Sequence, residues 1–360
     1  MSSNQINAIP SKGKVTWIAP SNIAIVKYWG KQALQEPINP SLSLTLNNAK
    51  TTTTVEFERI SNNKSAQIKL WFNGAEKPEF LPKINRFIEQ LTPFFPSIKN
   101  YYFTIHTSNS FPHSAGIASS ASSMSAFALC LLSISNIIKG ESPYPDLKTA
   151  STLARLGSGS ACRSVFGGWN LWGEHTQIAE SSNAYAINLN HQIHSNFMDV
   201  KDAILIISSD EKSVGSSAGH ELMTNHWFKQ SRIDMAIENT SNLINALSVG
   251  DWEQFIAITE HEALTLHGLM MSSNPGYLLL KPNTLLAIEA IRRYRLETGA
   301  NIAFTLDAGP NLHILYPNKE SEKIEVWINS HLRPLCENQF ILFDSQGNGP
   351  ELINYSHNNQ

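Results

Sequence analysis

Cysteine, charge and long apolar runs are all scarce in this chain of 360 residues. Its three cysteines, Cys130, Cys162 and Cys336, lie far apart and form no CxxC pair. This spacing argues against a disulfide framework or a zinc ribbon and favours a reducing compartment. Charged residues make up only 16% of the chain, with a formal net charge of −3, whereas an average globular protein has about 25%. Strongly basic nucleic-acid binders and highly charged disordered chains are therefore excluded.

Membrane and export signals are also missing. The longest apolar stretch, residues 126–138, contains Ser133, Ser135 and Asn136 and is too short to span a bilayer, so we expect a buried helix there. The first twenty residues lack the apolar segment of a secretory signal, and the C-terminal NYSHNNQ carries no lipidation or targeting motif. We therefore expect a cytoplasmic protein that binds neither a membrane nor nucleic acid.

Three common signatures are absent as well: the HExxH of zinc hydrolases, the GxGxxG of dinucleotide-binding folds and the Gly-Lys-Ser/Thr of a Walker A loop. What the chain has instead is two blocks of strand and helix patterns, separated by a loop-rich passage at 181–196. The first block favours strands at 14–18, 43–46, 51–57, 66–72 and 101–107 and helices at 81–91, 120–138 and 146–156. The second favours strands at 203–208, 301–306 and 312–316 and helices at 228–247, 251–266 and 285–296.

Helices that cover one face of an antiparallel sheet are the arrangement we expect in the second block, where the last two strands are joined by the tight sequence DAGPN. At the end of the first block, Asp146 is a candidate N-cap and Gly157 a candidate stop for one helix. We predict an α+β protein of two domains, residues 1–197 and 198–360.

Two glycine- and serine-rich segments of the first block are suited to binding phosphate. The first, SNSFPHSAGIASSASS at 108–123, runs into a long apolar helix, so its backbone N–H groups and hydroxyls could hold a phosphate and Mg²⁺. The second, LGSGSACRSVFGGWNLW at 156–172, adds Arg163, whose guanidinium can grip a carboxylate or phosphate. The alternatives are a simple helix N-cap for the first segment and a helix end followed by a turn for the second.

Two further segments place charged side chains at the ends of strands. SNIAIVKYWGKQ at 21–32 ends in two lysines, a tyrosine and a glycine, which together could form an anion pocket. FTLDAGPN at 304–311 places Asp307 directly after a strand, where a carboxylate can act as a general base or orient an alcohol. Taken alone, each of the two segments is better explained as an ordinary turn.

Together, the four segments resemble the diphosphomevalonate decarboxylases, the mevalonate-pathway members of the GHMP kinase superfamily. The motifs NIAIVKYWGK, FPHSAGIASSAS, ARLGSGSACRSVFGGW and TLDAGPN match those of the family, in the same order and over nearly the whole chain. The resemblance implies an N-terminal domain like domain 2 of ribosomal protein S5, a ferredoxin-like C-terminal domain and a homodimer. It also implies ATP- and Mg²⁺-dependent conversion of mevalonate 5-diphosphate to isopentenyl diphosphate, ADP, phosphate and CO₂, in isoprenoid biosynthesis.

The resemblance also implies site residues. Asp307 matches the aspartate that orients or deprotonates the 3-hydroxyl, and Lys27 matches the lysine beside it. The substrate-binding positions are Tyr28, Trp29, Gly30, Lys31, Ser158, Gly159, Ser160, Ala161, Cys162, Arg163, Ser216 and Ser217. The ATP-binding positions are Ser114, Gly116, Ala118, Ser119 and Ser120, of which Ser120 is also the candidate Mg²⁺ ligand.

The chain departs from the family pattern at three places. Relatives carry Thr or Arg where this chain has Ser217, and two prolines where it has Pro275 and Gly276. Lys83 is the best match for a substrate-facing arginine of the family. These departures leave open a decarboxylase that acts on the 5-monophosphate. A mevalonate 3-kinase and a catalytically silent binding protein are further alternatives. Related 3-kinases lack the aspartate–lysine pair that this chain keeps, and a silent protein is expected to have lost at least one catalytic side chain, whereas all four segments are intact here.

Overall fold

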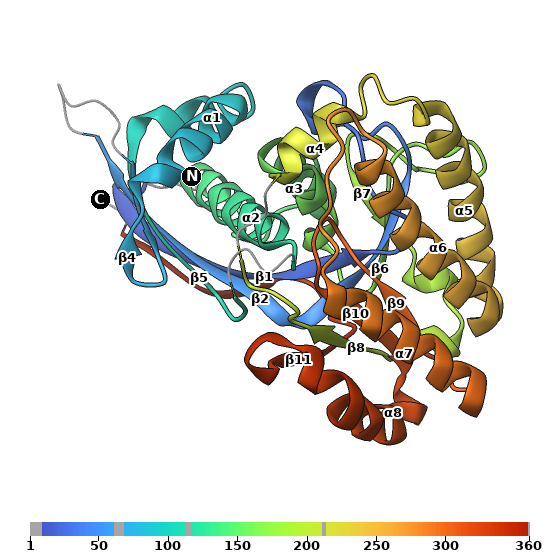
Figure 1. The fold of residues 1–360 in the computed structure, drawn as a ribbon. Coiled ribbons are helices and arrows are strands. Elements are labelled where there is room, and N and C mark those ends of the chain that lie inside the picture. Colours follow the sequence, from blue (N-terminus) through green and yellow to red (C-terminus); the bar gives the residue numbers. More distant parts are fainter. Residues whose placement is uncertain (1–8, 61–67, 113–116, 211–213, 359–360) are drawn as a thin grey trace.

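A computed structural model describes residues 9–60, 68–112, 117–210 and 214–358 of the chain. Within these residues the chain forms a large, strongly curved sheet and a smaller antiparallel sheet, each covered by helices (Figure 1). This mixed arrangement confirms the predicted α+β class.

The large sheet is built mainly from the first half of the chain. Its central path runs in the order β12-β1-β2-β5-β3-β4, and β6 pairs with β2 and β7 beside this path. The strands are β1 (Lys12–Ala24), β2 (Ser41–Arg59), β3 (Ile68–Phe72), β4 (Ala75–Glu76), β5 (Tyr101–Asn109), β6 (Trp169–Trp172), β7 (Ala186–Asn188) and β12 (Glu351–Asn358). The predicted strands at 43–46 and 51–57 are both part of β2, which is continuous but irregular between them.

Three helices pack on one face of the large sheet: α1 (Leu81–Leu91), α2 (Ser119–Lys139) and α3 (Leu147–Gly157) (Figure 1). α2 is the only helix of the described residues that is long and apolar enough to span a membrane, but 83% of its apolar window is buried inside the protein. Its buried Ser133 accepts a hydrogen bond from the indole N–H of Trp17 at 2.9 Å, so the polar group is satisfied. The predicted buried helix is therefore confirmed.

The small sheet belongs to the second half and has the order β11-β8-β10-β9. Its strands are β8 (Val200–Leu205), β9 (Ala303–Thr305), β10 (Leu312–Pro317) and β11 (Ile341–Ser345). The helices are α4 (Ser216–Leu222), α5 (Lys229–Val249), α6 (Trp252–Met271), α7 (Pro282–Thr298) and α8 (Ser321–Trp327). The predicted pairing on either side of DAGPN is confirmed, since β9 and β10 are antiparallel neighbours.

The last strand does not stay with the second half. β12 returns to the large sheet and pairs with β1 in antiparallel register, from Lys12 opposite Asn358 to Ile18 opposite Glu351. An apolar core also joins the halves, because side chains of β1 and β2 pack with those of α5, α6 and β8. The predicted division into two domains at residue 198 therefore stays a prediction. The two halves are joined by β12, which pairs with β1, and by this shared core.

A buried carboxylate fastens the two sheets together where β2 is irregular. Pro20 pairs with Lys50, but Asn22 already pairs with Thr45, so four residues of β2 between these partners lack ladder positions on β1. The carboxylate of Asp344 on β11 accepts hydrogen bonds from three of their backbone N–H groups, those of residues 47, 48 and 49, at 2.8, 2.7 and 2.7 Å. Backbone groups that the sheet leaves unpaired are thus satisfied from the other half of the chain.

Replacing Asp344 with Ala is expected to lower the free energy of unfolding by about 2–3 kcal/mol, because three backbone donors lose a charged acceptor. Urea denaturation measures the change. Asp199 is the control, since it is exposed and its ion pair with Lys201 is long at 3.5 Å. Its replacement by Ala is expected to cost less than about 1 kcal/mol. Equal losses in the two variants would contradict this role of Asp344.

Candidate active site

The two halves of the chain enclose a cleft of about 1040 Å³. It is lined by the segment after β1, by α1, by the starts of α2 and α4, by residues 156–160 and by the turn after β9. All four segments that the sequence singled out contribute side chains to it. Its cationic lining residues are Lys27, Lys31, Lys83, Arg86 and Arg163, and its acidic ones are Glu79, Glu221 and Asp307. The cleft is therefore suited to an anionic ligand.

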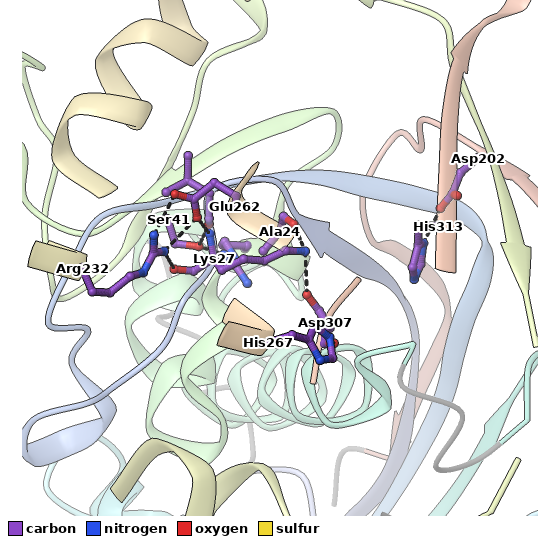
Figure 2. Close-up of polar contacts among 11 residues, drawn as sticks. Ala24, Lys27, Ser41, Asp202, Arg232, Glu262, His267, Asp307 and His313 are labelled. Atoms are coloured by element: carbon purple, nitrogen blue, oxygen red, sulfur yellow. Dashed lines mark hydrogen bonds and ion pairs between the residues drawn. The ribbon is translucent and has the colours of Figure 1, made fainter. Parts of the chain in front are cut away.

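The Lys27 ammonium and the Asp307 carboxylate meet in this cleft. Lys27 Nζ donates to Asp307 Oδ1 at 3.0 Å and also to the carbonyl of Ala24 (Figure 2). The two side chains are 280 positions apart in the sequence, and they differ in exposure: 1% for Lys27 against 30% for Asp307. The lysine is thus anchored in the protein, while the carboxylate remains open to a ligand.

Enclosure and charge act on Asp307 in opposite directions. Its enclosure in the cleft raises the pKa, but the charge and hydrogen bond of Lys27 outweigh this effect, with smaller contributions from His313 and Arg163, and the net result is a lowered pKa. Burial lowers the pKa of Lys27, and the charges of Asp307 and Glu262 oppose that effect. Asp307 is therefore an ionised acceptor at neutral pH, and it faces a cation.

Arg163 also lines the cleft. It lies in the 3-10 helix Gly159–Val165 and is only 3% exposed. Its NH1 group donates to the hydroxyl of Ser41, its guanidinium lies 5.9 Å from the centre of the Trp172 ring, and its Nε has no partner among the described residues. A buried guanidinium with spare N–H groups is well suited to a carboxylate.

The segment 28–31 is held against α4 by a histidine that the sequence analysis did not identify. His220 Nδ1 accepts a hydrogen bond from the backbone N–H of Gly30 at 2.9 Å. Its ring lies 4.4 Å from that of Tyr28 and 4.7 Å from that of Trp29. Burial and then the charge of Lys31 lower the pKa of His220 to about 3, so the ring is neutral. Because Nδ1 accepts, the proton of this neutral ring is on Nε2.

Close packing explains two glycines of this region. Gly30 has a φ of +93°, and a Cβ there would lie 2.3 Å from Ile38 Cδ1. A Cβ on Gly159 would lie 2.8 Å from the Trp172 ring and 2.9 Å from the Tyr28 hydroxyl oxygen. Both positions therefore exclude a side chain, which preserves the packing of Tyr28, a residue of the cleft wall, against the buried Trp172.

Lys31 and Lys83 form a second cationic region in the cleft, with no acidic partner among the described residues. Lys31 Nζ donates to the amide oxygen of Gln35 at 3.3 Å. Loss of solvation in the cleft and then the charge of Lys31 lower the pKa of Lys83. Two cations that repel each other mark a place where a polyanion would relieve the repulsion.

The opposite wall of the cleft is the start of α2. Ala118, with a φ of +45°, precedes the helix, and Ser119 and Ser120 begin it. The Ser120 hydroxyl lies 3.2 Å from that of Ser158, so this wall touches the segment 157–160. The described residues contain no cluster of three His, Cys, Asp or Glu side chains that could hold a metal by themselves. These hydroxyls fit an ion that is held mainly by the phosphates of a ligand, as is usual for Mg²⁺.

Most of the residues predicted for the site line the cleft, but some do not. The lining residues among them are Lys27, Tyr28, Trp29, Lys31, Ala118, Ser119, Ser120, Ser158, Gly159, Ser160, Arg163, Ser217 and Asp307. Ala161 and Cys162 are fully buried and do not reach the cleft. Gly30 does not line the cleft either; it packs closely against Ile38. Ser216 begins α4, while Ser114 and Gly116 lie outside the described residues.

Comparison with known proteins finds relatives over nearly the whole chain. The models of the diphosphomevalonate decarboxylase-like N-terminal domain and of the mevalonate 5-diphosphate decarboxylase C-terminal domain match residues 19–186 and 203–356. The diphosphomevalonate decarboxylase of Debaryomyces hansenii is 30% identical over 325 residues, which cover 85% of this chain and 80% of the relative.

Solved structures show the same fold. The mevalonate diphosphate decarboxylase of Staphylococcus aureus superposes with a TM-score of 0.81 at 29% identity, over 95% of this chain and 98% of that protein. A structure described as MDDEF in complex with MVAPP, AMPPCP and magnesium superposes with a TM-score of 0.79 at 28% identity, over 95% and 99%. The two-domain α+β fold of these proteins is therefore the fold of this chain.

Replacing Lys27 with Met is expected to raise the pKa of Asp307, because the enclosure that opposes ionisation stays while the opposing charge is lost. A ¹³C NMR titration of the aspartate carboxyl groups measures this pKa, with the Asp307 signal assigned from an Asp307→Asn variant. Lys201→Met removes a surface lysine and is expected to leave the Asp307 titration unchanged. An unshifted Asp307 in Lys27→Met would contradict the electrostatic coupling.

Proposed function

This chain belongs to the diphosphomevalonate decarboxylase family, and we propose that it converts mevalonate 5-diphosphate and ATP to isopentenyl diphosphate, ADP, phosphate and CO₂. The family is one of ATP-dependent decarboxylases of the mevalonate pathway. The observation that carries the proposal is the contact between Lys27 and Asp307 in a cleft that the guanidinium-bearing Arg163 also lines.

The first step is transfer of the γ-phosphoryl group to the tertiary 3-hydroxyl of the substrate. Asp307 accepts the hydroxyl proton or its hydrogen bond, since it is ionised and open to the cleft. The hydroxyl oxygen bonds to the γ-phosphorus, and the bond from that phosphorus to the bridging oxygen of ADP breaks. The ammonium of Lys27 stabilises the charge that the phosphoryl group carries during transfer.

The second step is elimination. The bond between C3 and the phosphate oxygen breaks and phosphate leaves with the electron pair. Positive charge develops at C3. The bond between C2 and the carboxylate carbon breaks, and its electrons form the alkene between C2 and C3 while CO₂ leaves. Arg163 holds the carboxylate in line for this elimination through its guanidinium, which is a positioning role.

The 5-diphosphate of the substrate binds at the second cationic region. Lys31 and Lys83 neutralise its charge, and the neutral phenol of Tyr28, whose pKa is raised by burial, donates a hydrogen bond. Ser158 lines the same cleft as these lysines, and its hydroxyl is 3.2 Å from that of Ser120 at the start of α2. It therefore contacts the substrate on one side and the phosphates of ATP on the other.

ATP binds along the start of α2, where Ala118, Ser119 and Ser120 line the cleft. A relative described as a complex with MVAPP, AMPPCP and magnesium supports the use of ATP and Mg²⁺ by the family. The hydroxyls of Ser119 and Ser120 hold the phosphates, and Ser120 is also placed to hold the ion. Mg²⁺ supplies neutralisation of the phosphate charge when it is bound.

A decarboxylase of the 5-monophosphate is the second candidate, favoured by one observation. Ser217 lines the cleft where a relative with arginine would add a cation, so the anion site has less charge than in such relatives. A mevalonate 3-kinase is a weaker candidate, since the pair of Lys27 and Asp307 is present. A homodimer and a cytoplasmic location also belong to this proposal.

A paired assay with purified protein, ATP and Mg²⁺ distinguishes these candidates. One reaction contains mevalonate 5-diphosphate and the other the 5-monophosphate, and both ADP and CO₂ are followed. We expect equal amounts of ADP and CO₂ from the diphosphate and little of either from the monophosphate. CO₂ mainly from the monophosphate would support the second candidate, ADP without CO₂ would support the 3-kinase, and neither product would contradict all three.

The Asp307→Asn variant is the control for the assay. It keeps the shape of the side chain but removes the charge that accepts the proton. We expect turnover to fall by orders of magnitude, about 10²–10⁴-fold for a lost general base, while ATP binding measured by calorimetry persists. Activity close to that of the native protein would show that another group acts as the base.

A further inference from the structure

Lys27 lies beyond the end of a strand, where the sheet no longer holds its backbone. β1 ends at Ala24, and the backbone N–H groups of Ile25 and Val26 both donate to the carbonyl of Leu42, at 2.8 and 3.2 Å. The N–H and C=O of Lys27 have no such ladder partner. Buried backbone groups require hydrogen bonds. The side-chain amide of Asn39, from the same half, donates to the carbonyl of Lys27 at 3.0 Å, and side chains from the other half of the chain supply the remaining partners.

Two helices of the second half supply these side chains (Figure 2). Glu262 on α6 accepts the backbone N–H of Lys27 at 2.8 Å through Oε2. Arg232 on α5 donates to the backbone carbonyl of Lys27 at 2.8 Å. The same guanidinium donates to both oxygens of Glu262 at 2.7 and 2.8 Å, and both side chains are essentially inaccessible to solvent, with exposures of 0% for Glu262 and 1% for Arg232.

The hydrogen bonds of Glu262 require a carboxylate. Its Oε2 accepts from the backbone N–H of Lys27 and from Arg232, and its Oε1 accepts from Arg232 and from the side-chain amide of Asn239 at 2.7 Å. All four partners are donors. An amide at this position would direct its NH₂ group at two donors in either orientation, so Gln would leave two of the four hydrogen bonds unmade.

We propose that the buried pair of Glu262 and Arg232 is a positioning device that fixes the backbone of Lys27 so that its ammonium reaches Asp307. The inference rests on the proposed function, because it concerns how the same site performs phosphoryl transfer. Lys27 and Asp307 come from different halves of the chain. Without the pair, Asn39 still holds the carbonyl of Lys27, but no described side chain of the second half ties the lysine backbone to the half that carries Asp307. A displacement of about 1 Å is enough to reduce catalysis about a hundredfold.

Stability alone is a poor explanation of such a pair. Replacing a buried ion pair with apolar side chains is often neutral or stabilising, because taking two charges out of water costs several kcal/mol. What an apolar pair would lack here is the acceptor for the N–H of Lys27 and one of the two donors to its carbonyl. A matched comparison exists on the same helix: Glu260, with a side-chain exposure of 7%, is paired with Arg292 and Arg295 of α7 and does not line the cleft.

Misplacement of Lys27 has a consequence for pH dependence. The charged or titratable side chains near Asp307 are Lys27 after β1, His313 on β10, Arg163 in its 3-10 helix, His220 on α4 and His267 on α6. The Nε2 of His267 lies 3.1 Å from the backbone carbonyl oxygen of Asp307. His220 is neutral, and the charge of Lys27 has the largest effect on the pKa of Asp307 after enclosure itself. When Lys27 moves away, enclosure prevails and the pKa of Asp307 rises. The acid limb of kcat/KM then moves to higher pH.

The test compares Glu262→Gln with Glu260→Gln in the full-length protein. We expect kcat of Glu262→Gln to fall about 10–100-fold, with the acid limb of kcat/KM shifted to higher pH and KM for ATP nearly unchanged. Glu260→Gln is expected to lose similar stability on urea denaturation but to keep its kcat within about twofold and its acid limb in place. A native kcat and acid limb in Glu262→Gln, or an equal fall of kcat in Glu260→Gln, would overturn the proposal.

Arg232→Lys is the second variant, for use where Glu262→Gln fails to fold. Lysine keeps the charge but lacks the planar fork that bridges Glu262 and the Lys27 carbonyl. A several-fold lower kcat with the same direction of acid-limb shift supports the positioning role, and native values of both overturn it. Failure of the proposed function itself is a separate result, because the native protein would then form no CO₂ from either substrate.

Discussion

The contact between the Lys27 ammonium and the Asp307 carboxylate joins two regions that fold on different sheets. Lys27 follows β1 of the large sheet, and Asp307 follows β9 of the small one. Opposite charges at 3.0 Å keep the carboxylate ionised despite its enclosure, and they require the two halves to be held together accurately. The chemistry proposed for the cleft therefore depends on how the halves are joined.

Three features of the structure join them. The carboxylate of Asp344 accepts the N–H groups that the irregular part of β2 leaves unpaired, and β12 returns to pair with β1. Close to the cleft, where the strand β1 has ended, Glu262 accepts the backbone N–H of Lys27 and Arg232 donates to its carbonyl. In all three places, side chains or a strand of the second half satisfy backbone groups of the first. Burying an ion pair costs free energy. Its position beside Lys27 is consistent with a role in placing the lysine backbone.

Local patterns were sufficient to predict much of the fold and the segments of the cleft. The bounds of α1 and the N-cap of α3, where Asp146 accepts the N–H of Thr149 at 2.8 Å, follow from apolar spacing and capping. The short strands β6 and β7, the return of β12 and the partners of Lys27 could not be predicted. Glu262 lies 235 positions from Lys27, and nothing in the sequence distinguishes it from the other acidic residues of its predicted helix. His220 was missed for the same reason, since its role comes from a contact with Gly30 across 190 positions.

A double-mutant cycle on Lys27 and Asp307 tests most directly whether the two side chains act as one unit. Single-turnover formation of ADP from ATP and mevalonate 5-diphosphate is measured for the native protein, Lys27→Met, Asp307→Asn and the double variant. Residues that act together have non-additive effects, so we expect the double variant to be no slower than the slower single variant. Losses that multiply in the double variant would show that the two groups act independently, and would contradict the account.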